Sequence, residues 1–223
     1  MGIVVEARDA LEEAADPALA PGQQAYMKSA MPFLGVRVPE VRRLVRGVAR
    51  HEKDASTLRD AALELWREAV HREERYAAQA LMAMPPLRGR LDMLDVHEEM
   101  VRTGAWWDHV DEVAHRLADL LDAHPDEMGV ELRVWSGDED FWMRRVAIIS
   151  QLGRRDRVDR ALLTDAIEPN IADQEFFIRK AIGWALRDLG RHDPDWVRAF
   201  VAQHPDLSPL SRREALKHLS PDS

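Results

Sequence analysis

Trp107 and Asp111 are the residues of this sequence best suited to chemistry. They lie four positions apart, so both side chains fall on one face of any helix that contains them. A carboxylate beside an indole suits a substrate that carries or develops positive charge, because both groups attract cations. The pair Trp106–Trp107 is also typical of side chains that simply pack between helices. The residues alone leave both interpretations open.

The sequence contains few residues or motifs that would support other kinds of catalysis. The chain has no cysteine, which excludes disulfides, thiolate nucleophiles, zinc ribbons and iron–sulfur clusters. It contains no H-E-x-x-H, G-x-S-x-G, Walker A or G-x-G-x-x-G motif. Asp111 and His115 could hold a metal or form a general-base couple, but a surface ion pair is the simpler interpretation. We therefore expect neither a metal nor an organic cofactor.

The charge of the chain first argues against a nucleic-acid partner. The 223 residues are 46% hydrophobic and 32% charged, and the formal net charge is −9. Residues 91–140 hold fifteen acids against three arginines, so the rest of the chain carries +3. A basic groove on an acidic protein is thus possible, although charge runs are usually solvated helix faces. The main basic clusters are Arg37, Arg42, Arg43, Arg46 and Arg50, then Arg144–Arg145, Arg154–Arg160, Arg179–Lys180, Arg187–Arg191 and Arg212–Lys217.

The apolar residues follow helical spacing almost throughout. Apolar positions recur at intervals of three and four, prolines fall between the periodic runs, and no stretch alternates as a half-buried strand does. About a dozen short helices are predicted. The acidic N-terminus does not resemble a secretory signal and no apolar run could span a bilayer, so a cytoplasmic protein is expected.

A repeat of about 35 residues organises these predicted helices. Similar segments surround Arg75, Arg145 and Lys180, and aromatic residues recur at Trp107, Trp142 and Phe177. This period predicts an all-α fold, an α-solenoid of HEAT-like helical repeats. We expect residues 1–223 to form a single domain with a concave groove, in which the helices up to about residue 22 are an atypical cap.

Residues at equivalent repeat positions become neighbours in a solenoid. Asp111 shares its position with Val146 and Ala181, so Arg145 and Trp184 fall close to it in the following repeats. Trp107, Asp111, Arg145 and Trp184 should therefore converge on one groove.

Several motifs, in this order along the chain, resemble a known family. They include YMKSAMPFLGVRVPEVRRL from Tyr26, AWWDHVDEVA from Ala105, FWMRRVAIISQL from Phe141 and EFFIRKAIGWALRDLGRHDPDWV from Glu175. They are similar to those of the AlkD-type DNA alkylation repair enzymes, which are HEAT-like-repeat DNA glycosylases. The resemblance covers about residues 23–219.

The resemblance implies a specific reaction. Such enzymes excise cationic N3- and N7-alkylpurines, such as 3-methyladenine and 7-methylguanine, from double-stranded DNA in base excision repair, without flipping the damaged base. It assigns the essential carboxylate to Asp111, lesion contacts to Trp107 and Trp184, and a DNA contact near the lesion to Arg145, with Arg144 as the alternative. The further DNA-binding residues expected are Tyr26, Lys28, Arg144, Lys180, Arg187, Arg212 and Arg213.

The segment WWDHVD contains no lysine, so a Schiff-base lyase step is not expected and the glycosylase should be monofunctional. A monomer that works on nucleoid DNA in the cytoplasm is the expected form. Two alternatives stay open: a non-catalytic HEAT-like binder of damaged or branched DNA, and a protein-binding scaffold.

Overall fold

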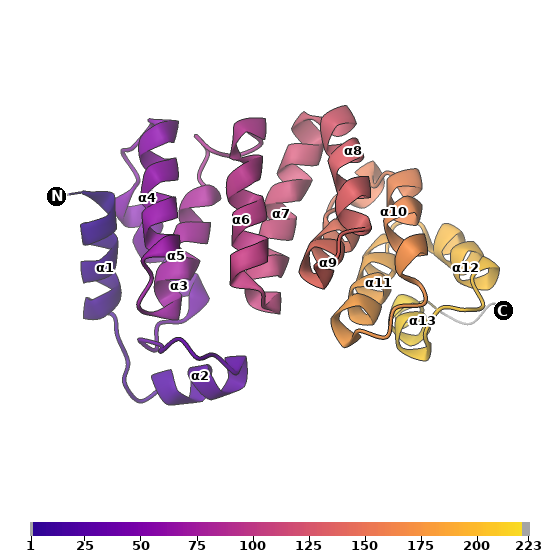
Figure 1. Ribbon diagram of the computed structural model, residues 1–223, viewed down its shortest axis with the longest axis horizontal. Coiled ribbons are helices and arrows are strands. Elements are labelled where there is room, and N and C mark those ends of the chain that lie inside the picture. Colours follow the sequence, from indigo (N-terminus) through magenta and orange to yellow (C-terminus); the bar gives the residue numbers. More distant parts are fainter. Residues whose placement is uncertain (1, 220–223) are drawn as a thin grey trace. The chain divides into compact units, whose positions relative to one another are not determined.

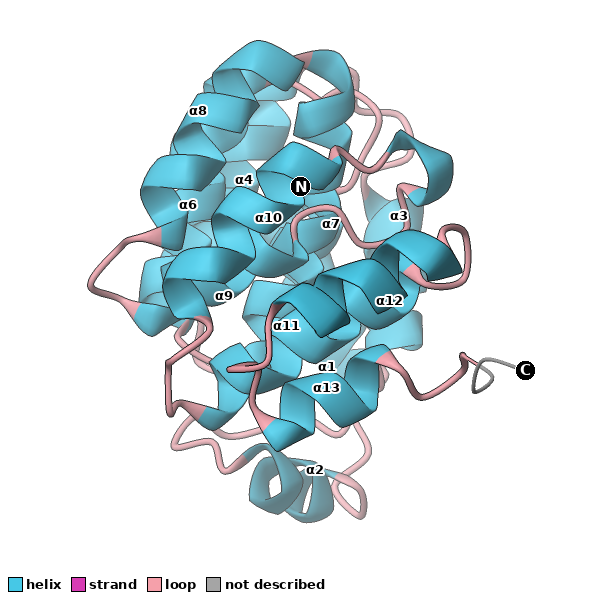
Figure 2. Ribbon diagram, turned by 90° about the vertical axis from the view of Figure 1, so that its right-hand side faces the viewer, coloured by secondary structure: helices cyan, strands magenta, loops and turns pink. Residues whose placement is uncertain are grey.

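The computed structural model describes residues 2–219, and their regular secondary structure is entirely helical (Figure 1). Figure 2 shows helices and loops but no strand over this range. The predicted all-α class is therefore confirmed. Among these residues, no helix is both long and apolar enough to cross a membrane.

Two compact units divide the chain, Met1–Val96 and His97–Ser223. The first contains α1 (Ile3–Glu13), α2 (Ala20–Met27), α3 (Val38–Val48), α4 (Ala55–Arg67), α5 (Arg72–Met82) and the 3-10 helix η1 (Leu91–Met93). Helix α6 (Leu94–Gly104) begins in the first unit and continues in the second. The second contains α7 (Trp107–Ala123), α8 (Pro125–Ser136), α9 (Phe141–Ile149), η2 (Arg155–Arg157), α10 (Arg160–Ile167), η3 (Glu168–Asn170), α11 (Phe176–Leu189), α12 (Pro194–Gln203) and α13 (Pro209–Ala215). That residues 1–223 act as one domain stays a prediction.

In the first unit, a buried carboxylate holds the segment before α3. Glu73 on α5 has no exposed surface, and it accepts hydrogen bonds from the amides of Leu34, Gly35 and Val36 at 2.9–3.1 Å. These bonds satisfy a charge that would otherwise be costly to bury. The loop between α2 and α3 is thereby fastened to α5.

In the second unit, the helix starts reproduce the predicted period. Helices α7, α9, α11 and α13 begin at Trp107, Phe141, Phe176 and Pro209, so successive starts lie 34, 35 and 33 residues apart. Each of these helices packs against the next one, and α8 packs against α10 (Figure 1). This arrangement is an α-solenoid of HEAT-like helical repeats, as the sequence predicts.

Polar contacts join residues that lie about one repeat apart. The Asn170 side chain donates to the carbonyl of Ser136 at 2.9 Å, over a sequence separation of 34. Arg102 pairs with Asp138 at 2.7 Å over a separation of 36. Further ion pairs of the same kind are Arg133–Asp165 and Arg160–Asp193. Charges that look scattered in the sequence thus connect successive repeats.

The packing of α11 against α13 depends on a glycine. A Cβ atom added to Gly183 would lie 2.5 Å from Cβ of Glu214 and 3.1 Å from the carbonyl oxygen of Ser211. The Ser211 hydroxyl also donates to the carbonyl of Arg179 at 2.8 Å. Gly183 therefore allows the two helices to approach closely enough for their polar groups to meet.

We predict that Gly183→Ala lowers the free energy of unfolding by about 1–3 kcal/mol, because the new methyl group overpacks the α11–α13 contact. Gly47→Ala is the control. It lies in α3, where an added Cβ meets nothing within 4 Å, and it should stabilise the protein by up to about 1 kcal/mol. Urea titration measures both. Equal effects of the two substitutions would contradict the close approach at Gly183.

Candidate active site

Helix α7 begins where the backbone turns sharply. Ala105 has a φ of 41°, Trp106 is extended, and Trp107 is the first residue of the helix. Asp111 follows one turn later, so it shares a helix face with Trp107. Both side chains are half-buried. The predicted juxtaposition of indole and carboxylate thus follows from where α7 starts.

Asp111 forms a two-point ion pair with Arg145 of α9, one repeat further along the chain. Nε of Arg145 donates to Oδ1 of Asp111 at 2.9 Å, and Nη2 donates to Oδ2 at 2.9 Å. The Arg145 side chain is 1% exposed, whereas that of Asp111 is 22% exposed. Because two parallel hydrogen bonds fix the plane of a carboxylate, Asp111 presents its exposed edge in one orientation.

The rest of the Arg145 guanidinium also contacts protein. Nη1 donates to the backbone carbonyl of Phe177 at 2.7 Å, and Cζ lies 5.4 Å from the ring centroid of Trp184. Asp111, Arg145 and Trp184 are thus brought together, as the repeat spacing suggests. The burial of Arg145 differs from the expected contact with DNA, since the guanidinium offers almost no surface to a phosphate.

Two opposing effects act on the acidity of Asp111. Burial raises the pKa of Asp111 above the ordinary aspartate value, and the charge and hydrogen bonds of Arg145 lower it. The net direction is upward, because desolvation of the carboxylate is the larger effect. Asp111 therefore keeps its proton to a higher pH than an ordinary aspartate does, because it lies partly buried at the edge of the core.

Trp184 is surrounded by cations. Besides Arg145, Nζ of Lys180 and Cζ of Arg187 lie 5.7 and 5.9 Å from its ring centroid. Both cations pair with Glu214 of α13, Lys180 at 2.8 Å and Arg187 at 2.6 Å. Lys180 and Arg187, which the sequence suggests as phosphate ligands, therefore already share one carboxylate.

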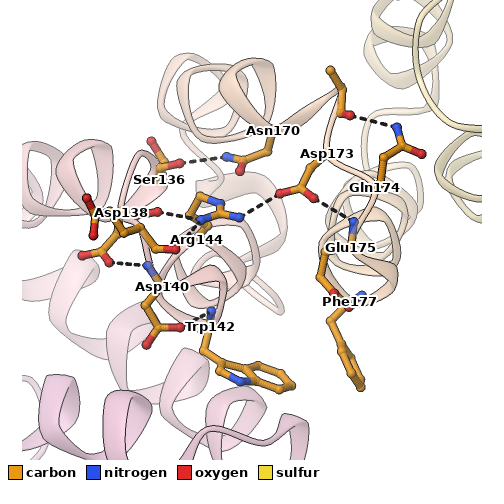
Figure 3. Close-up of polar contacts among 12 residues, drawn as sticks. Ser136, Asp138, Asp140, Trp142, Arg144, Asn170, Asp173, Gln174, Glu175 and Phe177 are labelled. Atoms are coloured by element: carbon orange, nitrogen blue, oxygen red, sulfur yellow. Dashed lines mark hydrogen bonds and ion pairs between the residues drawn. The ribbon is translucent and has the colours of Figure 1, made fainter.

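An aromatic cluster lies between successive repeats. The ring centroids of Trp106 and Phe177 are 5.6 Å apart, and those of Trp142 and Phe177 are 4.8 Å apart. Figure 3 shows Trp142 and Phe177 extending in the same direction from their two helices. Among the other tryptophans, Trp66, Trp135 and Trp142 are buried, while Trp106 and Trp196 are half-buried. Packing between helices, one of the two interpretations of Trp106, thus agrees with its ring contacts to Trp142 and Phe177.

Arg144 is engaged in a different way from its neighbour. It pairs with Asp173 at 2.8 Å and donates to the carbonyls of Asp138 and Glu139 at 2.7 and 3.0 Å (Figure 3). These contacts join the turn before α9 to the turn before α11. Both candidates for the arginine near the lesion are thus committed to protein contacts.

The remaining expected DNA-binding residues are dispersed. Arg212 donates to the carbonyl of His204 at 3.1 Å, and Arg213 is exposed on the same helix. Tyr26, which is 75% exposed, and Lys28 belong to the first unit, whereas the other candidates belong to the second. Lys28 ends α2 in a left-handed conformation with φ of 51°.

Arginines 154–160 are not simply a solvated helix face. Arg154 and Arg157 both pair with Asp122 at 2.9 Å, and Arg160 pairs with Asp193. Acids of the segment 91–140 thus neutralise cations that are distant in sequence. Within residues 2–219 no group of three or more His, Asp or Glu side chains could hold a metal ion.

Comparison with known proteins identifies the family. Residues 7–219 match the DNA alkylation repair enzyme family. The chain belongs to this family. It is also similar to the solved structure of a predicted DNA alkylation repair enzyme from Enterococcus faecalis, with 30% sequence identity and a TM-score of 0.85. That match covers 93% of this chain and 98% of the other. No curated protein matches the chain.

Membership of the DNA alkylation repair family indicates a role in repair of alkylated DNA. Sequence reasoning missed two contributors to the site of this family member, Glu214 and the carbonyl of Phe177. Glu214 is an isolated acid in the sequence, and a backbone carbonyl carries no residue signal. The only available hint for Glu214 was its separation of 34 from Lys180, which is one repeat.

We predict that Glu214→Gln destabilises this family member by roughly 1–3 kcal/mol at pH 7, because two cations lose their shared carboxylate. The hydrogen bond from Lys180 lowers the pKa of Glu214. The stabilisation is therefore complete above the ordinary glutamate pKa and is lost as the pH falls through the lowered value. Denaturant titration of both proteins from pH 7 to pH 3 should show their stabilities converge.

Asp195→Asn is the control, because Asp195 is 92% exposed and its pair with Arg198 is a surface ion pair worth about 0–1 kcal/mol. If the stability difference between wild type and Glu214→Gln stayed constant over this pH range, the pairing of Glu214 with Lys180 and Arg187 would not be the source of the effect.

Proposed function

We propose that the protein is a monofunctional DNA glycosylase that excises cationic N3- and N7-alkylpurines from duplex DNA. The observation that carries this proposal is the carboxylate of Asp111, which a buried arginine holds in a fixed plane while 22% of the side chain stays exposed. A fixed carboxylate with an open edge can stabilise positive charge on a substrate without reorganising.

The chemistry of the substrate explains why so few groups suffice. Alkylation at N3 or N7 makes the purine cationic and a good leaving group, so the base needs no strong general acid. As the glycosidic bond breaks, its electron pair goes to the base and positive charge develops on the deoxyribose. Asp111 can stabilise this oxocarbenium character and orient the water that attacks the sugar carbon. The base need not enter a protein pocket for this step.

The structure supports different roles for the surrounding residues. Arg145 is a positioning residue in this proposal, because it acts through Asp111 and has almost no exposed surface. Trp107 presents its indole next to the carboxylate and can attract the cationic substrate. Trp184 already has three protein cations close to its ring, so we assign it apolar contact with the deoxyribose.

DNA phosphates would be held by polar and charged side chains of both units. Lys180 and Arg187 are about a quarter exposed and each keeps donors that Glu214 does not use. Arg213, Tyr26 and Lys28 are exposed and can contact the backbone, and Arg212 and Arg144 would support them. No step of the proposal requires a metal, a cofactor or a second copy of the chain.

We predict that Asp111→Asn reduces the single-turnover rate of 7-methylguanine release from methylated duplex DNA by at least about 100-fold, because the amide cannot stabilise the developing cation. Affinity for the duplex should change little. The control is Glu112→Gln, which removes one negative charge at the next position of α7 and should retain near wild-type activity.

Each outcome separates the proposed function from its alternatives. If wild type released no alkylpurine, the glycosylase proposal would be wrong, and if Asp111→Asn were as active as wild type, the role of Asp111 would be wrong. Binding without release would favour a non-catalytic DNA binder, and the absence of salt-sensitive duplex binding would favour a scaffold. Strand cleavage at the abasic product would contradict monofunctional chemistry.

The acid limb of the pH profile offers a second test. Activity requires ionised Asp111, so it should fall as the pH decreases through the Asp111 pKa, which burial places above the ordinary aspartate value. Arg145→Lys replaces the two-point hydrogen bond, which lowers the pKa, with a weaker point charge. The acid limb should therefore move to higher pH in Arg145→Lys. The activity is measured at each pH as enzymatic release of 7-methylguanine minus its spontaneous release. An unchanged limb would contradict the positioning role of Arg145.

A further inference from the structure

A basic pocket lies within the first unit, between α3 and the end of α5. It has a volume of about 310 Å³. We call it the α3–α5 pocket and define it by its rim and its floor. The rim consists of Arg42, Arg46, Arg50, Glu52 and Lys53, and the floor consists of Ala80, Ala83, Met84, Pro85 and Pro86.

The cations of the rim are arranged in a row. Arg42, Arg46 and Arg50 follow one another at intervals of four residues along α3 and the turn after it, and all three are exposed. This interval places neighbouring members about 6 Å apart along the helix axis and on one face. Lys53 extends the row beyond the helix and is exposed too.

Two of these cations, Arg46 and Lys53, differ from other arginines of the unit in their lack of an acidic partner within the described part of the chain. Arg8 pairs with Glu74, Arg43 with Glu40 and Arg59 with Asp95. By comparison, the side chains of Arg46 and Lys53 form no ion pair with any residue from 2 to 219. In a chain of net charge −9, acids are plentiful, so the lack of an acidic partner at Arg46 and Lys53 among the described residues is a distinctive feature.

The single acid of the rim does not alter this balance. Oε1 of Glu52 accepts hydrogen bonds from the amides of Lys53 and Asp54 at 2.7 and 2.8 Å, so it stabilises the turn before α4. Arg50 donates to the His51 ring at 2.8 Å, which supplies no negative charge. The rim therefore keeps a net positive potential that favours an anionic ligand.

We propose that the α3–α5 pocket binds backbone phosphates of duplex DNA. The proposal rests on the proposed DNA substrate and extends it to the first unit. A row of donors matches a strand of successive phosphates, and the aliphatic floor can pack against deoxyribose. The floor has no aromatic side chain or polar side chain that could recognise a base, so binding at this pocket should be independent of sequence and of damage.

The test compares Arg46→Gln with Arg43→Gln in the full-length protein. Both substitutions remove one charge from an exposed arginine of α3, but Arg43 pairs with Glu40 and does not line the pocket. Anisotropy of a fluorescent, undamaged duplex gives the dissociation constant between 50 and 200 mM salt. Arg46→Gln should weaken binding about five- to ten-fold at low salt and reduce the salt slope by about 0.9, whereas Arg43→Gln should change both far less.

A double variant, Arg46→Gln with Lys53→Gln, should reduce the salt slope by about 1.8. The loss should be the same on undamaged and methylated duplexes. Equal effects of Arg46→Gln and Arg43→Gln would overturn the proposal, because they would reflect net charge alone.

The outcome also distinguishes this proposal from the proposed catalytic function. Release of 7-methylguanine by wild type together with an unchanged salt slope in the double variant would overturn only the phosphate site. Salt-dependent binding that needs Arg46 would support the site even if wild type released no base. If inorganic pyrophosphate raised the melting temperature of wild type through Arg46 while duplex binding did not need Arg46, the ligand would be a small anion and the assignment to DNA would be wrong.

Discussion

The ion pair between Asp111 and Arg145 is the constraint on which the site depends. Arg145 lies in an apolar run of α9 and is almost completely buried, so its charge must be compensated inside the protein. Two bonds to Asp111 and one to the Phe177 carbonyl supply this compensation. The exposed carboxylate therefore takes its orientation from the need to satisfy a buried guanidinium.

The same principle governs charge across the second unit. Ion pairs and side-chain hydrogen bonds connect residues 32–36 positions apart, so each repeat supplies partners for the next one. The acidic segment 91–140 is consequently a source of counter-charges for distant arginines as well as a contributor of surface charge. Net charge along the sequence is a poor guide to potential at the surface, because pairing removes cations from one place and leaves them in another.

The sequence predicted the helical class and the repeat because both depend on local periodicity. It also suggested that Asp111, Arg145 and Trp184 meet, because the period converts sequence distance into spatial proximity. It could not show that Arg145 is buried, since a charged residue in an apolar run has two plausible environments. Nor could it pair Lys180 and Arg187 with Glu214, because that contact needs the close approach that Gly183 permits between α11 and α13.

The contacts of Arg145 limit where the repeat array can gain or lose a repeat during evolution. One guanidinium contacts a side chain of α7 and the backbone of α11 from its own position in α9. A duplicated or deleted repeat anywhere between α7 and α11 would separate these three contributors and dismantle the centre. Lengthening or shortening of the solenoid is therefore compatible with the site only outside the stretch from α7 to α11, which must be inherited as a whole.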